Sequence, residues 1–138
     1  MAKLLTVAIT LIVIGIAVLL SQTNTWVIEA EAHEVEWLEV QGYLTAYSAK
    51  DSCHTGASCL MANGERAYIG GLACSRELEL GTLVRIAGGE LVCTDRLAKW
   101  AEYKDGLPVF DIFLGYGEEA YQEALNFGRV QTEVYIQK

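Results

Sequence analysis

The chain has 138 residues, of which 52% are hydrophobic and 20% charged, and it carries a formal net charge of −8 at pH 7. This length fits one domain and a targeting segment, and a single proline in so apolar a chain argues against disorder. Because its lysines and arginines are scattered singly, the chain has no basic patch to displace counterions from phosphates, so nucleic acid is not an expected partner.

The N-terminus is strongly apolar. Lys3 precedes an uncharged run, Leu4 to Leu20, which as a helix would span roughly 25 Å. A positive residue before this run and acidic residues after it orient the N-terminus inward and the rest of the chain outward. Residues 1–28 are therefore interpreted as a signal anchor or a signal peptide, with Ala30-Glu31-Ala32 as a cleavage site in the second case.

An acidic linker, residues 29–38, is expected to lead into one folded domain, residues 39–138. Strand-forming residues begin near Trp37. From Lys50 to Gly64 the chain is rich in turn residues and is interpreted as a loop. A short apolar piece, Tyr68 to Cys74, follows this loop.

The second half of the domain has the clearest patterns. Thr82 to Thr94 contains two alternating apolar runs around Gly88-Gly89, which predicts a hairpin with both glycines in its turn. Val109 to Leu114 predicts an apolar strand, Glu118 to Phe127 a short helix, and Arg129 to Gln137 a last strand. The expected fold is mainly β: a small closed barrel with one or two short helices.

The four cysteines are Cys53, Cys59, Cys74 and Cys93. An even number in an exported protein favours two disulfides, for which three pairings are possible. A bridge between Cys53 and Cys59 would close a short loop, and Cys74 and Cys93 would then join segments about twenty residues apart. A zinc site that includes His54 is the alternative, but the spacing is irregular, so neither a metal nor a cofactor is expected.

Two aspartates stand out by their surroundings. Asp95 ends one apolar run, and Asp111 lies inside another. A carboxylate in such a setting is costly to bury unless it is paired or hydrogen-bonded. If the two strands are neighbours, the pair could share a proton, which would raise one pKa into the range of a general acid for glycosidic bond cleavage. Alternatively, Asp95 caps the next loop and Asp111 pairs with Arg96 or Arg129.

Several short motifs occur in an order that is similar to a known family. They are Thr45-Ala46-Tyr47-Ser48, Ala62-Asn63-Gly64, Leu72-Ala73-Cys74, Leu80 to Ile86, Thr94-Asp95-Arg96 and Phe110 to Phe113. With these motifs, residues 40–137 resemble the 3D (three-aspartate) domain, a six-stranded double-psi β-barrel of cell-wall proteins. This family is related to lytic transglycosylases, RlpA-like proteins and expansin-like proteins.

The resemblance implies roles for the matching residues. Asp95 matches the catalytic acid of the lytic transglycosylase relatives, and Asp111 matches the carboxylate that supports it. Ser75 stands where the family has its first aspartate. Asp105, followed by Gly106, is either a third carboxylate or a plain turn. The residues expected to contact glycan are Thr45, Tyr47, Asn63, Arg96 and Asp105, with Trp100 and Tyr103 as further surfaces for sugar rings.

The function implied is that of an exported domain that cleaves peptidoglycan or a related cell-wall glycan, as a lytic transglycosylase with an aspartate as general acid and base. The alternatives are a non-catalytic polysaccharide-binding barrel of the expansin-like type, or a disulfide-stapled effector that acts on a protein. The expected location is extracytoplasmic, either anchored in the membrane by the N-terminal helix or secreted after cleavage. A monomer is expected, because nothing in the sequence indicates oligomerisation.

Overall fold

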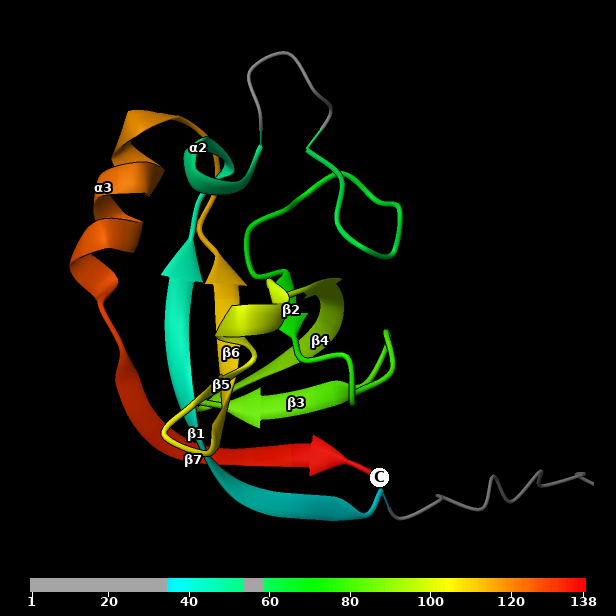
Figure 1. Cartoon of the computed structure of the whole chain (residues 1–138). Helices are drawn as coiled ribbons and strands as arrows, with labels where there is room; N and C mark the ends of the chain where they lie inside the picture. The colour runs from blue at the N-terminus through cyan, green and yellow to red at the C-terminus, as the bar shows by residue number, and fades with distance from the viewer. Residues whose placement is uncertain (1–34, 54–58) are drawn as a thin grey trace, which may run out of the picture. The chain divides into compact units, whose positions relative to one another are not determined.

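The computed structural model describes residues 35–53 and 59–138, which belong to one compact unit, Glu34–Lys138 (Figure 1). The predicted signal anchor or signal peptide, residues 1–28, and its cleavage site lie outside the described residues. In the part of the chain that the structure describes, no helix is both long and apolar enough to cross a membrane.

The described residues form seven strands, two helices and one 3-10 turn. The strands are β1 (Trp37–Tyr47), β2 (Leu72–Cys74), β3 (Leu83–Ile86), β4 (Gly89–Arg96), β5 (Tyr103–Lys104), β6 (Leu107–Phe113) and β7 (Val130–Gln137). The helices are α2 (Ala49–Ser52) and α3 (Gly117–Phe127), and the 3-10 turn is η1 (Lys99–Ala101). Most expected elements are therefore present, although α2 occupies the start of the predicted 50–64 loop.

Six of these strands close into a mixed barrel. Their order is β1-β7-β3-β4-β2-β6, and β6 pairs back with β1 to complete the circuit. The β1–β6 and β2–β4 pairs are parallel, whereas the other four pairs of the barrel are antiparallel. β5 lies outside the barrel and forms a hairpin with β6. The expectation of a mainly β, closed six-stranded barrel with few helices is confirmed.

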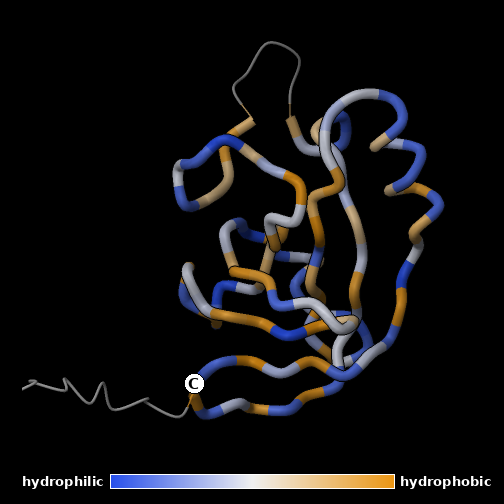
Figure 2. Tube along the Cα trace, turned by 180° about the vertical axis from the view of Figure 1, so that it is seen from behind, coloured by the Kyte–Doolittle hydropathy of each residue, from blue (hydrophilic) through white to orange (hydrophobic). Residues whose placement is uncertain are grey.

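Hydrophobic and hydrophilic residues follow one another along the strands (Figure 2), and the buried hydrophobic residues form two apolar layers. One layer draws on all six barrel strands and fills the interior; its buried members are Leu44, Leu72, Cys74, Val84, Ile86, Cys93, Phe110, Val134 and Ile136. The second layer lies on the opposite face of β1, β2 and β6, which we call the outer face. Its buried members are Tyr47, Ala49, Met61, Ala67, Ala73, Leu97, Val109 and Phe113.

The β3–β4 hairpin is present, but its turn is one residue earlier than predicted. Gly89 already pairs with Ile86, so the turn consists of Ala87 and Gly88. Both have positive φ, 50° and 78°, as a type I′ turn requires. The prediction that Gly88 and Gly89 form the turn is therefore wrong. The predicted last strand is present as β7, with Val134 and Ile136 buried and Val130 at its start 49% exposed.

All four cysteines are in disulfides. Cys53 is bonded to Cys59 with a Cα–Cα distance of 5.3 Å, and Cys74 to Cys93 with a distance of 5.9 Å. The first bridge closes a local loop beside α2. The second joins β2 to β4 inside the barrel, where both cysteines are fully buried. Among the three possible pairings, this is the one that contains the shortest loop, with a sequence separation of 6.

Candidate functional site

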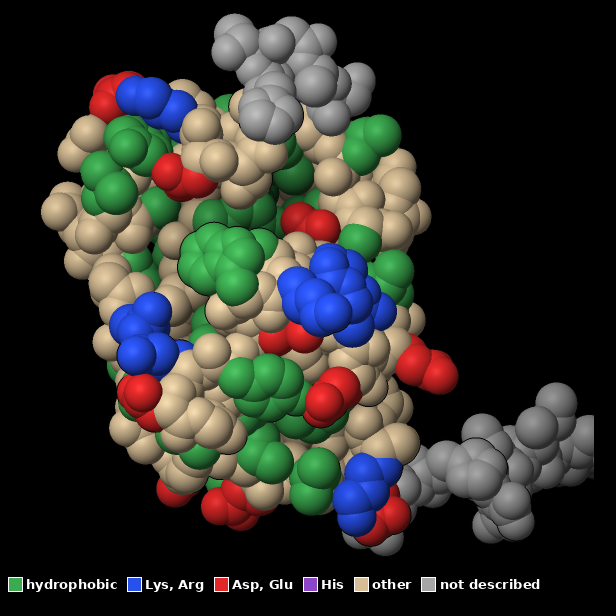
Figure 3. Space-filling model, in the orientation of Figure 1, with side chains coloured by type: hydrophobic (Ala, Val, Ile, Leu, Met, Phe, Trp, Pro, Cys, Tyr) green, Lys and Arg blue, Asp and Glu red, His purple; other side chains and the backbone are tan. Residues whose placement is uncertain are grey.

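A cleft of about 630 Å³ opens on the outer face of the barrel. Its walls come from the ends of β1, β4 and β6, from α2 and η1, and from the α3 residues Ala124 and Leu125. Hydrophobic, acidic and basic side chains meet around a hollow on the face shown in Figure 3. Both aspartates predicted from the sequence, Asp95 and Asp111, line this cleft.

Asp95 faces the cleft because β4 contains an extra residue. In the parallel pairing, Leu72 lies opposite Cys93 and Ala73 lies opposite Asp95, so Thr94 is bulged out of register. Without this bulge Asp95 would share the side of Cys93, whose side chain is in the barrel interior. A bulge commonly re-aims a side chain next to a functional site. Here it brings the carboxylate onto the outer face.

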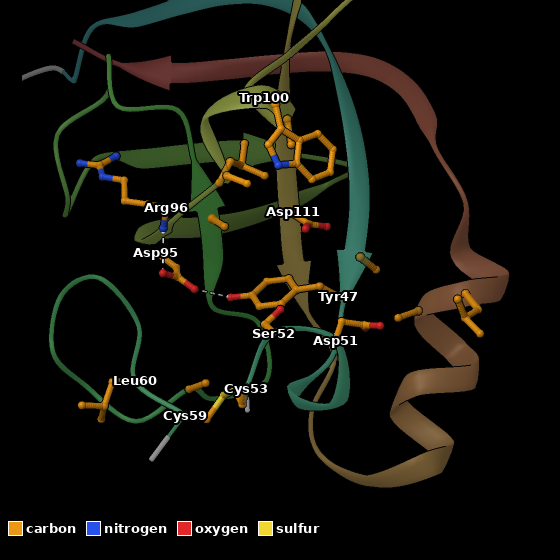
Figure 4. Close-up of a pocket in the computed structure, with 18 residues that line it drawn as sticks. Tyr47, Asp51, Ser52, Cys53, Cys59, Leu60, Asp95, Arg96, Trp100 and Asp111 are labelled. Atoms are coloured by element: carbon orange, nitrogen blue, oxygen red, sulfur yellow. Dashed lines mark hydrogen bonds between the residues drawn. A yellow bond between two sulfur atoms is a disulfide. The ribbon is translucent and has the colours of Figure 1, made fainter. Parts of the chain in front are cut away.

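Three donors hold the Asp95 carboxylate. Oδ1 accepts hydrogen bonds from the backbone N–H of Ala62 at 3.0 Å and of Arg96 at 2.8 Å, and Oδ2 accepts one from the Tyr47 hydroxyl at 2.8 Å. Figure 4 shows the Tyr47 hydroxyl pointing at this carboxylate. An ionised carboxylate is an acceptor only, and every partner here is a donor. The arrangement is therefore that of an oriented anion.

Tyr47 is buried and its ring packs edge-to-face on Phe113, with 5.2 Å between centroids. Burial raises the pKa of its hydroxyl strongly, and the nearby negative charge of Asp95 raises it further. The hydroxyl therefore keeps its proton at any physiological pH. It acts as a fixed donor to Asp95 rather than as an acid.

Asp111 has a different environment. Phe110 and Ile112 on either side of it pack in the barrel interior, so Asp111 points to the outer face. Burial raises the pKa of its carboxyl, the Asp51 and Asp95 charges raise it further, and the hydrogen bond from Thr45 opposes these effects. Thr45 donates to Oδ1 at 2.6 Å and is the only side-chain donor to Asp111 among the described residues.

The two aspartates are not on neighbouring strands. β2 lies between β4 and β6, and Ala73 pairs with Asp95 on one side and with Asp111 on the other. No direct hydrogen bond joins the two carboxyls within the described ranges, so the structure does not place a shared proton between them. The arginine partners considered for Asp111 lie elsewhere: Arg96 donates to the Ser75 carbonyl at 2.8 Å, and Arg129 lies over the Tyr43 ring.

The other predicted contact residues are dispersed. Thr45 and Tyr47 hold the two aspartates, but Asn63 lies in an exposed turn where its side chain bonds Glu65. Arg96 lines the cleft with its guanidinium turned away from both aspartates (Figure 4). Asp105 has a φ of 53° in the two-residue turn between β5 and β6, with its side chain 64% exposed and outside the cleft.

Ser75, which the resemblance singled out, is buried directly after β2. It does not line the cleft; its carbonyl accepts the hydrogen bond from Arg96. The acidic residues of the cleft, Asp51, Asp95 and Asp111, come from other positions in the chain.

Several cleft residues were not predicted, among them Asp51, Leu60 and Leu125. Asp51 had a visible signal, because Ser48-x-x-Asp51 has the spacing of a capping box, and Asp51 Oδ2 accepts from the Ser48 N–H at 3.0 Å and hydroxyl at 2.8 Å. Leu60 and Leu125 gave no such signal. Each is an ordinary leucine whose position depends on how α3 and the segment after Cys59 fold over the barrel.

A scan against protein-family models finds no match, and a search of curated proteins finds no relative of this chain. The closed barrel and its carboxylate-lined cleft are therefore the basis for the functional argument.

Proposed function

We propose that this chain is an exported lytic transglycosylase that cleaves the glycan strands of peptidoglycan, built on a double-psi β-barrel of the 3D type. The observation that carries the proposal is the pair of aspartates, Asp95 and Asp111, that open into one cleft from different environments. A closed six-stranded barrel with two parallel strand pairs is compatible with the double-psi topology. Glycosidic cleavage requires a proton donor beside an anion, and this pair can supply both.

The environments favour Asp111 as the proton donor, which reverses the roles that the family resemblance implies. A general acid needs a raised pKa and an oxygen that can reach substrate. Burial raises the pKa of Asp111, and Thr45 engages only one of its oxygens. In contrast, both Asp95 oxygens already accept hydrogen bonds. Asp95 is therefore suited to stabilise the positive charge that develops on the sugar ring.

The reaction balances without water. Asp111 donates its proton to the glycosidic oxygen, and the bond between that oxygen and the anomeric carbon breaks. The Asp111 carboxylate then accepts the proton of the 6-hydroxyl of the same sugar, whose oxygen bonds to the anomeric carbon. The products are a 1,6-anhydro sugar end and a free hydroxyl on the leaving sugar. The acid is regenerated, so no metal ion or second base is required.

Two features support export. Both disulfides are formed, and such bonds persist in oxidising compartments outside the cytoplasm. The apolar run of residues 4–20 is the sequence feature that would direct or anchor the chain there. On this proposal the partners are cell-wall glycan and, through the N-terminal segment, the membrane, and the protein acts as a monomer.

A non-catalytic glycan-binding barrel of the expansin-like type is the second candidate. If Asp95 were the acid, as the resemblance implies, its carboxylate would favour this candidate, because an anion with three donors is a poor source of protons. The serine at position 75, in place of the family's first aspartate, favours it as well.

The test compares the full chain, Asp111→Asn and Asp95→Asn on purified peptidoglycan, with soluble products analysed by mass spectrometry. We expect 1,6-anhydro-muropeptides from the parent, none from Asp111→Asn, and a reduced yield from Asp95→Asn. If Asp95→Asn alone abolishes product, the roles are those implied by the resemblance. If none of the three forms product while all sediment with the wall, the domain is a binding module.

A further inference from the structure

Trp100 is the most exposed of the large hydrophobic side chains in the described part of the chain, at 86%, and yet it lines the cleft. An indole offers a large apolar face, and an exposed one costs free energy that a ligand can recover. Figure 4 shows Trp100 in the cleft that contains Asp111 and Tyr47. At this exposure the ring contributes little to packing among residues 35–53 and 59–138.

The turn that carries Trp100 is firmly held. Before it, the Leu97 N–H donates to the Cys74 carbonyl at 3.2 Å, and after it the Val109 N–H donates to the Glu102 carbonyl at 3.0 Å. These bonds tie η1 to β2 and β6, and the segment that contains it begins after Asp95 and leads into the strand of Asp111. The indole is thus an exposed ring on an anchored turn that lies between Asp95 and Asp111 in the chain.

The rim of the cleft carries two further exposed hydrophobic residues. Leu60 is 59% exposed and Leu125 is 57% exposed, and they come from segments that are distant from η1 in the chain. Exposed apolar groups that meet at one cleft mark a binding site more specifically than the same residues scattered singly. Tyr103, the other predicted sugar platform, differs: its hydroxyl bonds Glu77 and it does not line the cleft.

We propose that Trp100 is the stacking platform for one sugar ring of the glycan strand, a deeper statement of the function proposed above. A pyranose has an apolar face of C–H groups and a polar edge of hydroxyls. The cleft presents the matching groups, an aromatic face at its rim and carboxylates inside it. A sugar ring stacked on Trp100 fixes the position along the glycan strand at which the carboxylates act. Trp100 is therefore a binding residue that sets position, and it transfers no proton.

The test uses tryptophan fluorescence, which does not depend on cleavage. The chain has three tryptophans, so the full-length Trp26→Phe/Trp37→Phe variant reports on Trp100 alone. The probe is soluble peptidoglycan glycan strands freed of their peptide stems. We expect a saturable blue shift of emission, because stacking removes the indole from water.

Binding is then measured by calorimetry for the parent, Trp100→Ala and Trp100→Phe. We expect Trp100→Ala to weaken binding about tenfold and Trp100→Phe to restore most of it. Tyr103→Phe, which changes an aromatic residue outside the cleft, is the matched control and should bind as the parent does. Because Trp100 is exposed, its variants should keep the parent's melting temperature.

The outcomes separate this inference from the proposed function. An emission spectrum that does not respond to glycan strands, or Trp100→Ala binding within twofold of the parent, overturns the inference even if anhydro products form. A blue shift with weakened binding in Trp100→Ala supports it even if no product forms, in which case cleavage alone is rejected.

Discussion

Tyr47 donates its hydroxyl hydrogen to Oδ2 of Asp95 at 2.8 Å, although β6 and β2 separate their strands in the barrel. This contact joins β1 to β4 across the cleft on the outer face. It also gives one residue two tasks, because the Tyr47 ring packs on Phe113 while its hydroxyl orients a carboxylate. Changing the hydroxyl alone therefore tests the second task without removing the first.

Tyr47→Phe should lower the free energy of unfolding by about 2 kcal/mol, because it removes a partly buried hydrogen bond to a charged group and keeps the ring. Urea denaturation measures the change. Tyr135→Phe is the control, since its hydroxyl makes one long contact of 3.4 Å at the surface and should change little. Equal effects of the two substitutions would mean that the Tyr47–Asp95 bond adds no stability.

Asp111→Asn should change how stability depends on pH. Burial raises the pKa of Asp111 in the folded protein, so the folded state binds more protons than the unfolded state above the ordinary aspartate pKa of about 3.9. The parent therefore loses stability as pH rises from below this value through the raised pKa, and the asparagine variant avoids that loss.

Melting temperatures at pH 3 and pH 7 measure this effect. The melting temperature of Asp111→Asn, taken relative to that of the parent, should be higher at pH 7 than at pH 3. Asp105→Asn, at an exposed turn, controls for the removal of one negative charge. A constant difference across the range would show that Asp111 does not titrate differently in the two states.

The two disulfides should contribute unequally. In the chain-entropy treatment, a bridge with a separation of 19 residues, such as Cys74–Cys93, stabilises by about 3 kcal/mol, and one with a separation of 6, such as Cys53–Cys59, by about 2 kcal/mol. Alanine pairs at each bridge, compared by denaturation, test this order. Replacement of Cys74 and Cys93 should lower the free energy of unfolding further, because both side chains are fully buried and their removal leaves a cavity. The opposite order would contradict the expectation.

Gly42→Ala should destabilise the barrel by about 1–3 kcal/mol. A Cβ at this position would lie 3.1 Å from the Pro108 carbonyl oxygen and from Val134 Cγ2, and 3.2 Å from Phe110 Cε2. Gly89→Ala is the matched control, because the nearest atom to its Cβ would be 3.7 Å away. Similar denaturation midpoints for the two variants would show that the barrel can relax around position 42.

Local patterns in the sequence were enough to predict the β3–β4 hairpin, α3 and the final strand, because each depends on residues close together in the chain. The order in which strands pair was not predictable in this way, since β2 meets β4 and β6 through contacts that no short window contains. The position of the turn was missed by one residue because Ala87 adopts positive φ, which its residue type does not indicate.

The candidate site was predictable in part. Asp95 and Asp111 were singled out as charges in apolar strands, and both line the cleft. The sequence did not indicate that β2 separates the two aspartates or that they have different hydrogen-bond donors. These features depend on the order of the strands and on backbone N–H groups. Asn63 was expected to contact glycan, whereas the nearby backbone N–H of Ala62 is the group that reaches Asp95.

The bulge at Thr94 separates the direction of the Asp95 side chain from that of Cys93. Substitutions at position 94 can keep the extra residue, and Asp95 then stays on the outer face. Deletion of Thr94 would also leave Cys93 in the interior and Asp95 on the outer face, because the two residues would then alternate regularly, although the hydroxyl that accepts a hydrogen bond from the Leu72 N–H at 3.2 Å would be lost. Among descendants of this gene, loss of the codon at position 94 should therefore be compatible with the site, whereas loss of the codon at position 93 would remove one cysteine of the interior disulfide.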